Sequence, residues 1–158
     1  MKEIYCDGSC FGNPGPGGWG VLVKDETITA EVYGHQTKTT NNQMELMAAI
    51  TAVKFVSLGE NAIIYTDSKY VIQGITEWLK NWKKNKWLTA KKEPVKNSEL
   101  WKELDSLSQS KKINWTWVKA HNGNEGNERV DLLAKMGTNG KSNIHVLDDL
   151  VAKFFRAE

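Results

Sequence analysis

Four carboxylates stand out as side chains that could act together on a substrate. Asp7 and Asp67 each lie at the carboxyl end of a predicted strand, where open α/β sheets place ligands. Glu45 has alanines at i+3, i+4 and i+7 of a predicted helix. It therefore faces inward, where an unpaired carboxylate is costly. Asp131 lies on a helix that follows a glycine-rich loop. A meeting of these groups would create a site of oxygen ligands alone.

Such a site favours Mg²⁺, with Mn²⁺ as the alternative, because hard cations prefer oxygen ligands. Two such ions about 3.5–4 Å apart are a recurring device for phosphodiester cleavage. His121 stands on a glycine-flanked loop and could carry a proton near neutral pH. Read alone, Asp7 also fits an Asp-Gly turn and Asp67 a helix cap. Asp131 and His121 alone fit ordinary solvated positions.

A second cluster combines positive charge with aromatic rings. Seven lysines and a single acid lie between Lys80 and Asn97, in a chain whose net charge is only +2. Four of the seven tryptophans lie in or beside this window: Trp78, Trp82, Trp87 and Trp101. Lysines neutralise phosphates and aromatic faces pack on sugars and bases, so the interleaved cluster indicates nucleic-acid binding. The alternative is a solvated lysine face over core tryptophans.

Hydrophobic periodicity predicts the elements that must hold these groups. Strands are expected at 3–9, 19–23, 28–32, 61–66 and 113–117, with a hairpin turn at 25–27. Helices are expected from Asn41 or Asn42 to about 57, over 68–85 in one or two pieces, from Asn97 or Ser98 to 108, and to about 136 after the loop 122–126. This order predicts an α/β fold, in which a mixed five-stranded sheet with an antiparallel meander and parallel strands is flanked by helices.

The composition is that of one globular domain. The chain has 158 residues, of which 40% are hydrophobic and 25% charged, and no apolar run is long enough to span a membrane. The first residues show no signal-like apolar segment, and the two cysteines lack partner ligands for a zinc site. We therefore expect a cytoplasmic protein with reduced thiols.

The last residues carry a separate helical pattern. The apolar positions recur at i, i+3, i+4, i+7 and i+8, and they are Leu147, Leu150, Val151, Phe154 and Phe155. This spacing predicts an amphipathic helix. We expect the helix to dock on the body of the protein, and binding of a weak protein partner is the alternative.

The order of the motifs resembles type 1 ribonuclease H. The matching segments are DGSC at 7–10, GNPGPGG at 12–18, TTNNQMEL at 39–46, TDS at 66–68, WKK at 82–84, and His121 followed by NERVD at 127–131. Each segment is short, but their order and spacing over residues 2–137 are specific, and the chain is similar to bacterial ribonuclease HI. The resemblance implies the ribonuclease H-like fold. It also implies a catalytic domain at 1–141 with a basic handle at about 78–97, before the tail at 142–158.

The resemblance also implies roles by position. The catalytic metal ligands would be Asp7, Glu45, Asp67 and Asp131, and His121 would assist water activation or product release. The implied reaction is endonucleolytic hydrolysis of the RNA strand of an RNA–DNA hybrid with Mg²⁺, leaving 3′-hydroxyl and 5′-phosphate ends. The family selects RNA through its 2′-hydroxyl, and the implied enzyme is a monomer without membrane association.

Substrate contacts follow from the same comparison of positions. Five residues match minor-groove contacts, and they are Cys10, Asn13, Asn41, Asn42 and Gln43. Thr40 and Asn97 match residues that hold a phosphate of the DNA strand, and Trp78 matches one that lies against its sugar. The handle that raises affinity for the hybrid corresponds to 80–87, with Trp82, Lys83, Lys84 and Lys86.

The chain departs from the family pattern at a few positions. Gln43 stands where many bacterial members carry arginine, Lys69 where glutamine is common, and Ala120 where glycine is usual. The helical pattern of the tail is also not the usual ending. None of these changes removes an acidic residue of the implied site.

Two other function classes stay open from the residues. A nucleic-acid binding module would keep the basic handle and use the carboxylates structurally. A DNA-processing nuclease of the integrase, transposase or resolvase type would share the fold, although such enzymes usually carry additional DNA-binding domains.

Overall fold

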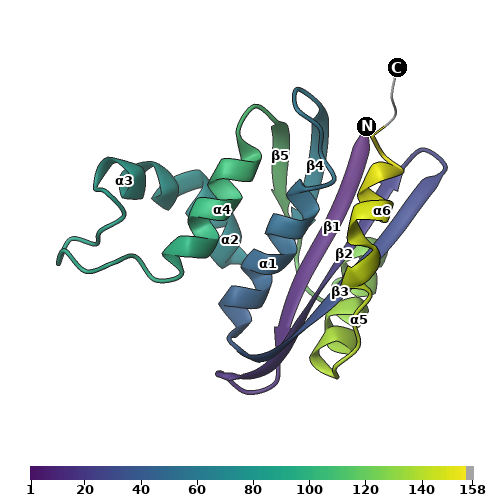
Figure 1. Ribbon diagram of the computed structural model, residues 1–158, viewed down its shortest axis with the longest axis horizontal. Helices are drawn as coiled ribbons and strands as arrows, with labels where there is room; N and C mark the ends of the chain where they lie inside the picture. Colours follow the sequence, from purple (N-terminus) through teal and green to yellow (C-terminus); the bar gives the residue numbers. More distant parts are fainter. Residues whose placement is uncertain (156–158) are drawn as a thin grey trace.

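A computed structural model describes residues 1–155 and contains one five-stranded sheet (Figure 1). The strand order is β3-β2-β1-β4-β5. β1 pairs antiparallel with β2, as β2 does with β3, while β4 runs parallel to both β1 and β5. The mixed sheet is therefore confirmed. The strands are β1 (Lys2–Cys10), β2 (Gly15–Asp25), β3 (Ile28–Thr39), β4 (Asn61–Thr66) and β5 (Lys112–Trp117).

The helices agree with the predicted order and differ in some bounds. They are α1 (Asn41–Val53), α2 (Lys69–Gln73), η1 (Gly74–Trp78), α3 (Leu79–Lys84), α4 (Ser98–Ser108), α5 (Glu125–Thr138), η2 (Ile144–Val146) and α6 (Leu147–Ala152). The predicted extension of the first helix to Ser57 is wrong, because α1 ends at Val53 and a turn follows. No helix within residues 1–155 combines the length and the apolar character that crossing a membrane requires.

The two faces of the sheet carry separate apolar layers. The larger layer lies under α1 and α4 and includes the fully buried Phe55 and Trp101. The smaller layer lies under α5 and includes Leu22, Val130 and Leu133. Because α1 and α5 pack against opposite faces of β1 and β2, acids from both helices can approach the same end of β1 (Figure 1).

The start of α1 is fixed against β1 by a missing side chain. A Cβ atom at Gly8 would lie 2.3 Å from the backbone nitrogen of Glu45, so only glycine allows this approach. The side chain of Thr40 caps the helix by accepting a hydrogen bond from the backbone N–H of Gln43 at 3.2 Å. The predicted cap at Asn41 or Asn42 is wrong, since both residues lie inside the first turn.

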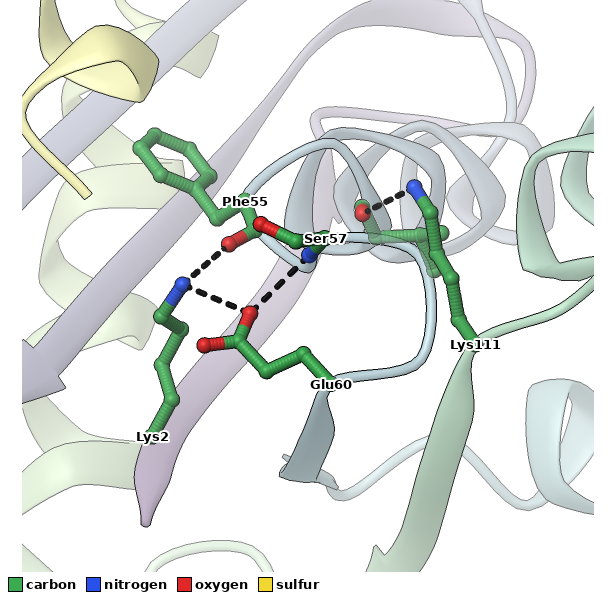
Figure 2. A network of polar contacts seen from close by, with 6 residues as sticks. Lys2, Phe55, Ser57, Glu60 and Lys111 are labelled. Carbon is green, nitrogen blue, oxygen red and sulfur yellow. Dashed lines mark hydrogen bonds and ion pairs between the residues drawn. The ribbon is translucent and has the colours of Figure 1, made fainter. Parts of the chain in front are cut away.

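The opposite end of α1 is held by a partly buried polar network (Figure 2). The ammonium group of Lys2 donates to the carbonyl oxygen of Phe55 at 2.7 Å and pairs with Glu60 at 2.9 Å. Glu60 also accepts from the backbone N–H of Ser57, and Lys111 donates to the carbonyl oxygen of Val53 at 3.0 Å. Lys2, the first residue of β1, and Lys111, just before β5, thus donate to carbonyl groups at and beyond the end of the helix.

The tail docks on the body, as expected. The Asn143 side chain accepts from the backbone N–H of Tyr33 at 2.8 Å and donates to the carbonyl oxygen of Glu31 at 2.9 Å. The tail thus provides hydrogen-bond partners for backbone groups of the edge strand β3. Leu147 and Phe154 are buried in the larger apolar layer. The predicted helix through Phe155 is too long, because α6 ends at Ala152. Residues 156–158 of the predicted tail lie outside the described residues.

Candidate active site and nucleic-acid interface

Three of the four predicted carboxylates meet at one end of the sheet. Asp7 comes from β1, Glu45 from α1, and Asp67 from the residue that follows β4. One oxygen from each lies within 4.8 Å of the others. Glu45 is oriented by the backbone N–H of Gly8, which donates to its Oε1 atom at 2.5 Å. The sequence motifs that carry these acids therefore converge, although 38 and 22 positions separate them in the chain.

The surroundings of these acids favour a cation. Burial raises the pKa of the Asp7 carboxyl well above its ordinary value, and the negative charges of Glu45 and Asp67 raise it further. Burial also raises the pKa of Glu45, and the charge of Asp67 adds to this effect. Asp7 is 4% exposed and Glu45 7% exposed. An all-oxygen set of crowded carboxylates fits a divalent cation such as Mg²⁺, which would offset both the burial and the repulsion.

Asp131 lies outside this group of three. Its Oδ2 atom pairs with the ammonium group of Lys135 one turn later on α5, at 2.9 Å. Its negative charge nevertheless adds a small contribution to the raised pKa values of Asp7 and Glu45. The structure therefore places the fourth predicted ligand beside the cluster, with a lysine as its present counter-charge.

Asn127 is a site residue that the sequence interpretation did not single out. It is 3% exposed and its side-chain amide donates to the Oδ2 atom of Asp67 at 3.2 Å. The indole N–H of Trp117 donates to the Asp67 carbonyl oxygen at 3.1 Å. The available signal for Asn127 was its position four residues before Asp131, on the same helix face.

His121 lies on the loop between β5 and α5. Its side chain is exposed and its backbone is left-handed, with φ of 55°. Gly123, two residues later, also has a positive φ. The predicted histidine is thus free of the packed core, in a loop that joins Trp117 to the helix of Asp131.

A small polar pocket gathers several predicted substrate contacts. Its volume is about 290 Å³, and its lining residues are Asn13, Thr40, Asn41, Asn42, Lys96 and Asn97. The Asn13 side chain accepts from the backbone N–H of Asn41 at 3.2 Å, which ties the glycine-rich loop to α1. Cys10 lies apart from this lining, and its thiol contacts the carbonyl oxygen of Thr39 at 3.4 Å. Lys96 adds a positive charge that the sequence interpretation counted only within the handle.

The handle projects from one side of the body (Figure 1). It is built on a cluster of packed aromatic rings. Trp82 lies 5.7 Å from Trp78, 6.2 Å from Trp87 and 5.4 Å from Trp101, measured between ring centroids. The lysines of the segment are exposed. One of them is already paired, because Lys83 contacts Asp105 of α4 at 3.2 Å. The aromatic cluster thus packs against the larger apolar layer and also supports the segment that carries the exposed lysines.

Comparisons with known proteins agree with this geometry. The sequence model of the family described as RNase H matches residues 1–139. The ribonuclease H of Pseudomonas entomophila (strain L48) is 53% identical over 135 residues, which are 85% of this chain and 91% of that protein.

Solved structures show the same fold. The crystal structure of LC9-RNase H1, a type 1 RNase H with the type 2 active-site motif, has a TM-score of 0.77 at 30% identity and covers 90% of this chain and 74% of that chain. LC11-RNase H1, solved in complex with an RNA/DNA hybrid, has a TM-score of 0.66 at 24% identity, with coverages of 88% and 97%. The chain belongs to the RNase H family, as a type 1 ribonuclease H that cleaves RNA endonucleolytically in RNA–DNA hybrids.

Proposed function

We propose that Asp7, Glu45, Asp67 and Asp131 are the catalytic metal ligands for cleavage of the RNA strand. The observation that supports this proposal most strongly is the meeting of the buried Asp7 and Glu45 with the half-buried Asp67, with no basic side chain among these three. The metal is Mg²⁺, with Mn²⁺ as a substitute, because all ligands are carboxylate oxygens. The products carry 3′-hydroxyl and 5′-phosphate ends.

The protein groups have separate tasks in this proposal. When bound, the divalent cation supplies activation of water and neutralises negative charge at the scissile phosphate. Glu45 is kept aimed at the site by the N–H of Gly8, and Asp67 by the amide of Asn127. His121 lies on its exposed loop, where it takes up a proton from water or assists product release.

We also propose which residues contact the RNA–DNA hybrid. Cys10, Asn13, Asn41, Asn42 and Gln43 face the minor groove of the hybrid. Thr40 and Asn97 hold a DNA-strand phosphate in the polar pocket, with Lys96 as an added charge, and Trp78 lies against the neighbouring sugar. The handle residues Trp82, Lys83, Lys84 and Lys86 raise affinity by neutralising phosphates.

Assembly, location and domain division complete the proposal. The tail buries Leu147 and Phe154 in the body of its own chain, which supports a monomeric enzyme and leaves the exposed face of α6 as the surface for any weak protein partner. We place the enzyme in the cytoplasm. Residues 1–141 form the catalytic domain with its handle, and 142–158 form the appended tail.

A cleavage assay with labelled duplexes tests the function. Equal amounts of RNA–DNA hybrid, double-stranded RNA and duplex DNA are incubated with Mg²⁺ or with EDTA. We expect cutting of the RNA strand of the hybrid alone, only with the metal. Retention of the hybrid without metal-dependent cutting would indicate a binding module. Equal cutting of duplex DNA would indicate a DNA-processing nuclease.

A further inference from the structure

A chain of hydrogen bonds connects the polar pocket to the aromatic cluster of the handle. The Thr39 hydroxyl donates to Oε1 of Gln43 at 2.9 Å, and Nε2 of Gln43 donates to Oδ1 of Asn97 at 3.2 Å. Nδ2 of Asn97 then donates to the Tyr70 hydroxyl at 3.2 Å, which also accepts from the indole N–H of Trp101 at 3.0 Å. The chain crosses β3, α1, α2 and α4 and ends on a fully buried tryptophan.

Asn97 is held in an unusual way for its position. It precedes α4, where an asparagine side chain usually caps the helix, yet its side chain makes no cap bond. Its backbone is left-handed, with φ of 60°, a conformation that costs free energy for most residues. The side chain is turned instead towards Gln43 and Tyr70, so the local structure gives up a cap to place this amide.

The orientation of the Asn97 amide matters for an anion. An amide has an acceptor oxygen, which repels phosphate, and a nitrogen with two donor hydrogens. Gln43 takes the oxygen, and Tyr70 takes one of the two hydrogens. Within residues 1–155, the second donor hydrogen therefore has no protein partner, and it belongs to a side chain that lines the pocket.

Tyr70 is the junction between the two halves of this arrangement. Its ring lies 5.3 Å from Trp101 and 5.8 Å from Trp78, measured between centroids, while its hydroxyl reaches Asn97. The ring therefore belongs to the tryptophan cluster and the hydroxyl to the pocket. Because the ring and the hydroxyl belong to one side chain, a movement of the tryptophan cluster also moves the hydroxyl that contacts Asn97.

We propose that Tyr70 and Gln43 are positioning residues for the DNA strand, which hold the Asn97 amide with its donor side available to a backbone phosphate. This inference rests on the proposed substrate surface. It also explains why glutamine serves at position 43 in this chain: its amide can donate to Asn97 and accept from Thr39 at once, which a guanidinium cannot do.

The test removes the Tyr70 hydroxyl and keeps the ring. Tyr70→Phe is compared with the parent on hybrids in which one DNA-strand linkage at a time is a neutral methylphosphonate. In the parent, one linkage should raise KM clearly when neutralised. In Tyr70→Phe, we expect KM for the unmodified hybrid to rise about 3- to 10-fold with kcat nearly unchanged. For Tyr70→Phe, the ratio of KM with that linkage neutralised to KM for the unmodified hybrid should fall towards 1.

Two further variants separate positioning from general stability. Tyr65→Phe removes a hydroxyl on the α5 face of the sheet, where Tyr65 stacks on Tyr5, and it should leave KM and the linkage profile unchanged. Gln43→Met should act in the same direction as Tyr70→Phe. The double variant should be less than additive in free energy, because both changes release the same amide.

The outcomes distinguish this inference from the proposed function. If the parent does not cleave the hybrid, the function itself fails. If the parent cleaves and Tyr70→Phe keeps the parent linkage profile, or only its melting temperature falls, the positioning role is wrong. Fluorescence anisotropy of the hybrid in EDTA gives the same comparison without catalysis, with an expected 3- to 10-fold weaker binding for Tyr70→Phe.

Discussion

The two ends of α1 bury charge in opposite ways. At its start, Glu45 meets Asp7 and Asp67, and no cation lies among these three acids in residues 1–155. Beyond its end, the buried ammonium group of Lys2 is satisfied by the Phe55 carbonyl and by Glu60. One end pairs its buried charge with an opposite charge of the protein, whereas the other gathers like charges.

This difference separates a site for stability from a site for chemistry. A buried charge with a full set of partners holds elements in place, and it does so at no cost to function. Crowded acids without a counter-charge lower stability unless a cation or protons join them. The network in Figure 2 anchors the far end of α1, the helix that carries Glu45.

The largest effect is expected from removing one charge of the carboxylate cluster. Asp7→Asn should lower kcat for hybrid cleavage by at least about 10³-fold, because the metal site loses an anionic ligand while the shape is kept. The melting temperature in EDTA should not fall. The matched control is Asp149→Asn on the exposed face of α6, and it should cleave at the parent rate. Near-normal turnover of Asp7→Asn would remove Asp7 from the site.

At the other end of α1, the change should affect stability and spare catalysis. Lys2→Met leaves Glu60 and the Phe55 carbonyl without their cation. We expect a loss of about 2–3 kcal/mol in the free energy of unfolding, measured by urea denaturation, since Glu60 is partly exposed and water replaces some of the interaction. The kcat at a temperature well below melting should stay within about two-fold of the parent.

Two controls sharpen this second prediction. Lys24→Met changes an exposed lysine on the neighbouring strand β2 and should leave stability nearly unchanged. Lys2→Met combined with Glu60→Gln should recover part of the loss, because no charge is then left unpaired. A large fall in kcat for Lys2→Met would mean that the network beyond the end of α1 also affects catalysis, which would contradict the prediction.

The pH dependence of stability should differ with and without metal. Because the folded protein raises the pKa values of Asp7 and Glu45, it binds more protons than the unfolded chain above about pH 4. Their contribution to stability is present at low pH and is lost as the pH rises through the raised folded values. In EDTA, the melting temperature should therefore fall from pH 5 to pH 9 more steeply for the parent than for Asp7→Asn.

Magnesium should reverse this trend. Metal binding requires deprotonated carboxylates, so the rise in melting temperature on adding Mg²⁺ should grow with pH. Thermal scans at several pH values with Mg²⁺ or EDTA provide the measurement. Equal pH slopes for the parent and Asp7→Asn in EDTA would show that these acids do not carry the effect.

The smallest effect is expected at the handle, and it should depend on which lysine is changed. Neutralising Lys84 and Lys86 should raise KM a few-fold more than it lowers kcat, and should flatten the dependence of log KM on log salt by about 1 per lost phosphate contact. Lys83→Gln should change the slope less, because Lys83 is already paired with Asp105. Equal slopes for the parent and the double variant would contradict the role of the handle.

The sequence predicted the fold better than the bounds of its elements. Alternation identified β5, and a continuous apolar run identified β4; both strands are confirmed. The end of α1 was misplaced because residues 54–57 contain no helix-breaking Gly or Pro, yet the chain turns there and Lys111 and Lys2 donate to the carbonyl groups of Val53 and Phe55. The cap was misplaced because Asn41 and Asn42 are favourable capping residues, while Thr40 has the extended backbone that a cap requires.

Some features of the candidate site were also predictable from the sequence, and others were not. The alanine neighbours of Glu45 were enough to predict that it faces inward, and the order of the motifs was enough to predict the family. Local sequence gave no reason to pair Asn127 with Asp67, or Tyr70 with Asn97, since each pair joins segments separated by many residues. The pairing of Lys135 with Asp131 needed the helix of α5 to bring them into register.

Residue chemistry and periodicity alone predicted a mixed sheet, four acids suited to an oxygen-only site if they meet, and a basic aromatic cluster, because these depend on local spacing and on side-chain type. Only the tertiary structure decided which acids meet, which lysines are already paired, and which asparagine is held by Gln43 and Tyr70. Those outcomes depend on distances of a few ångströms between distant segments, and such distances are set by the packing of α1, α4 and α5 on the sheet.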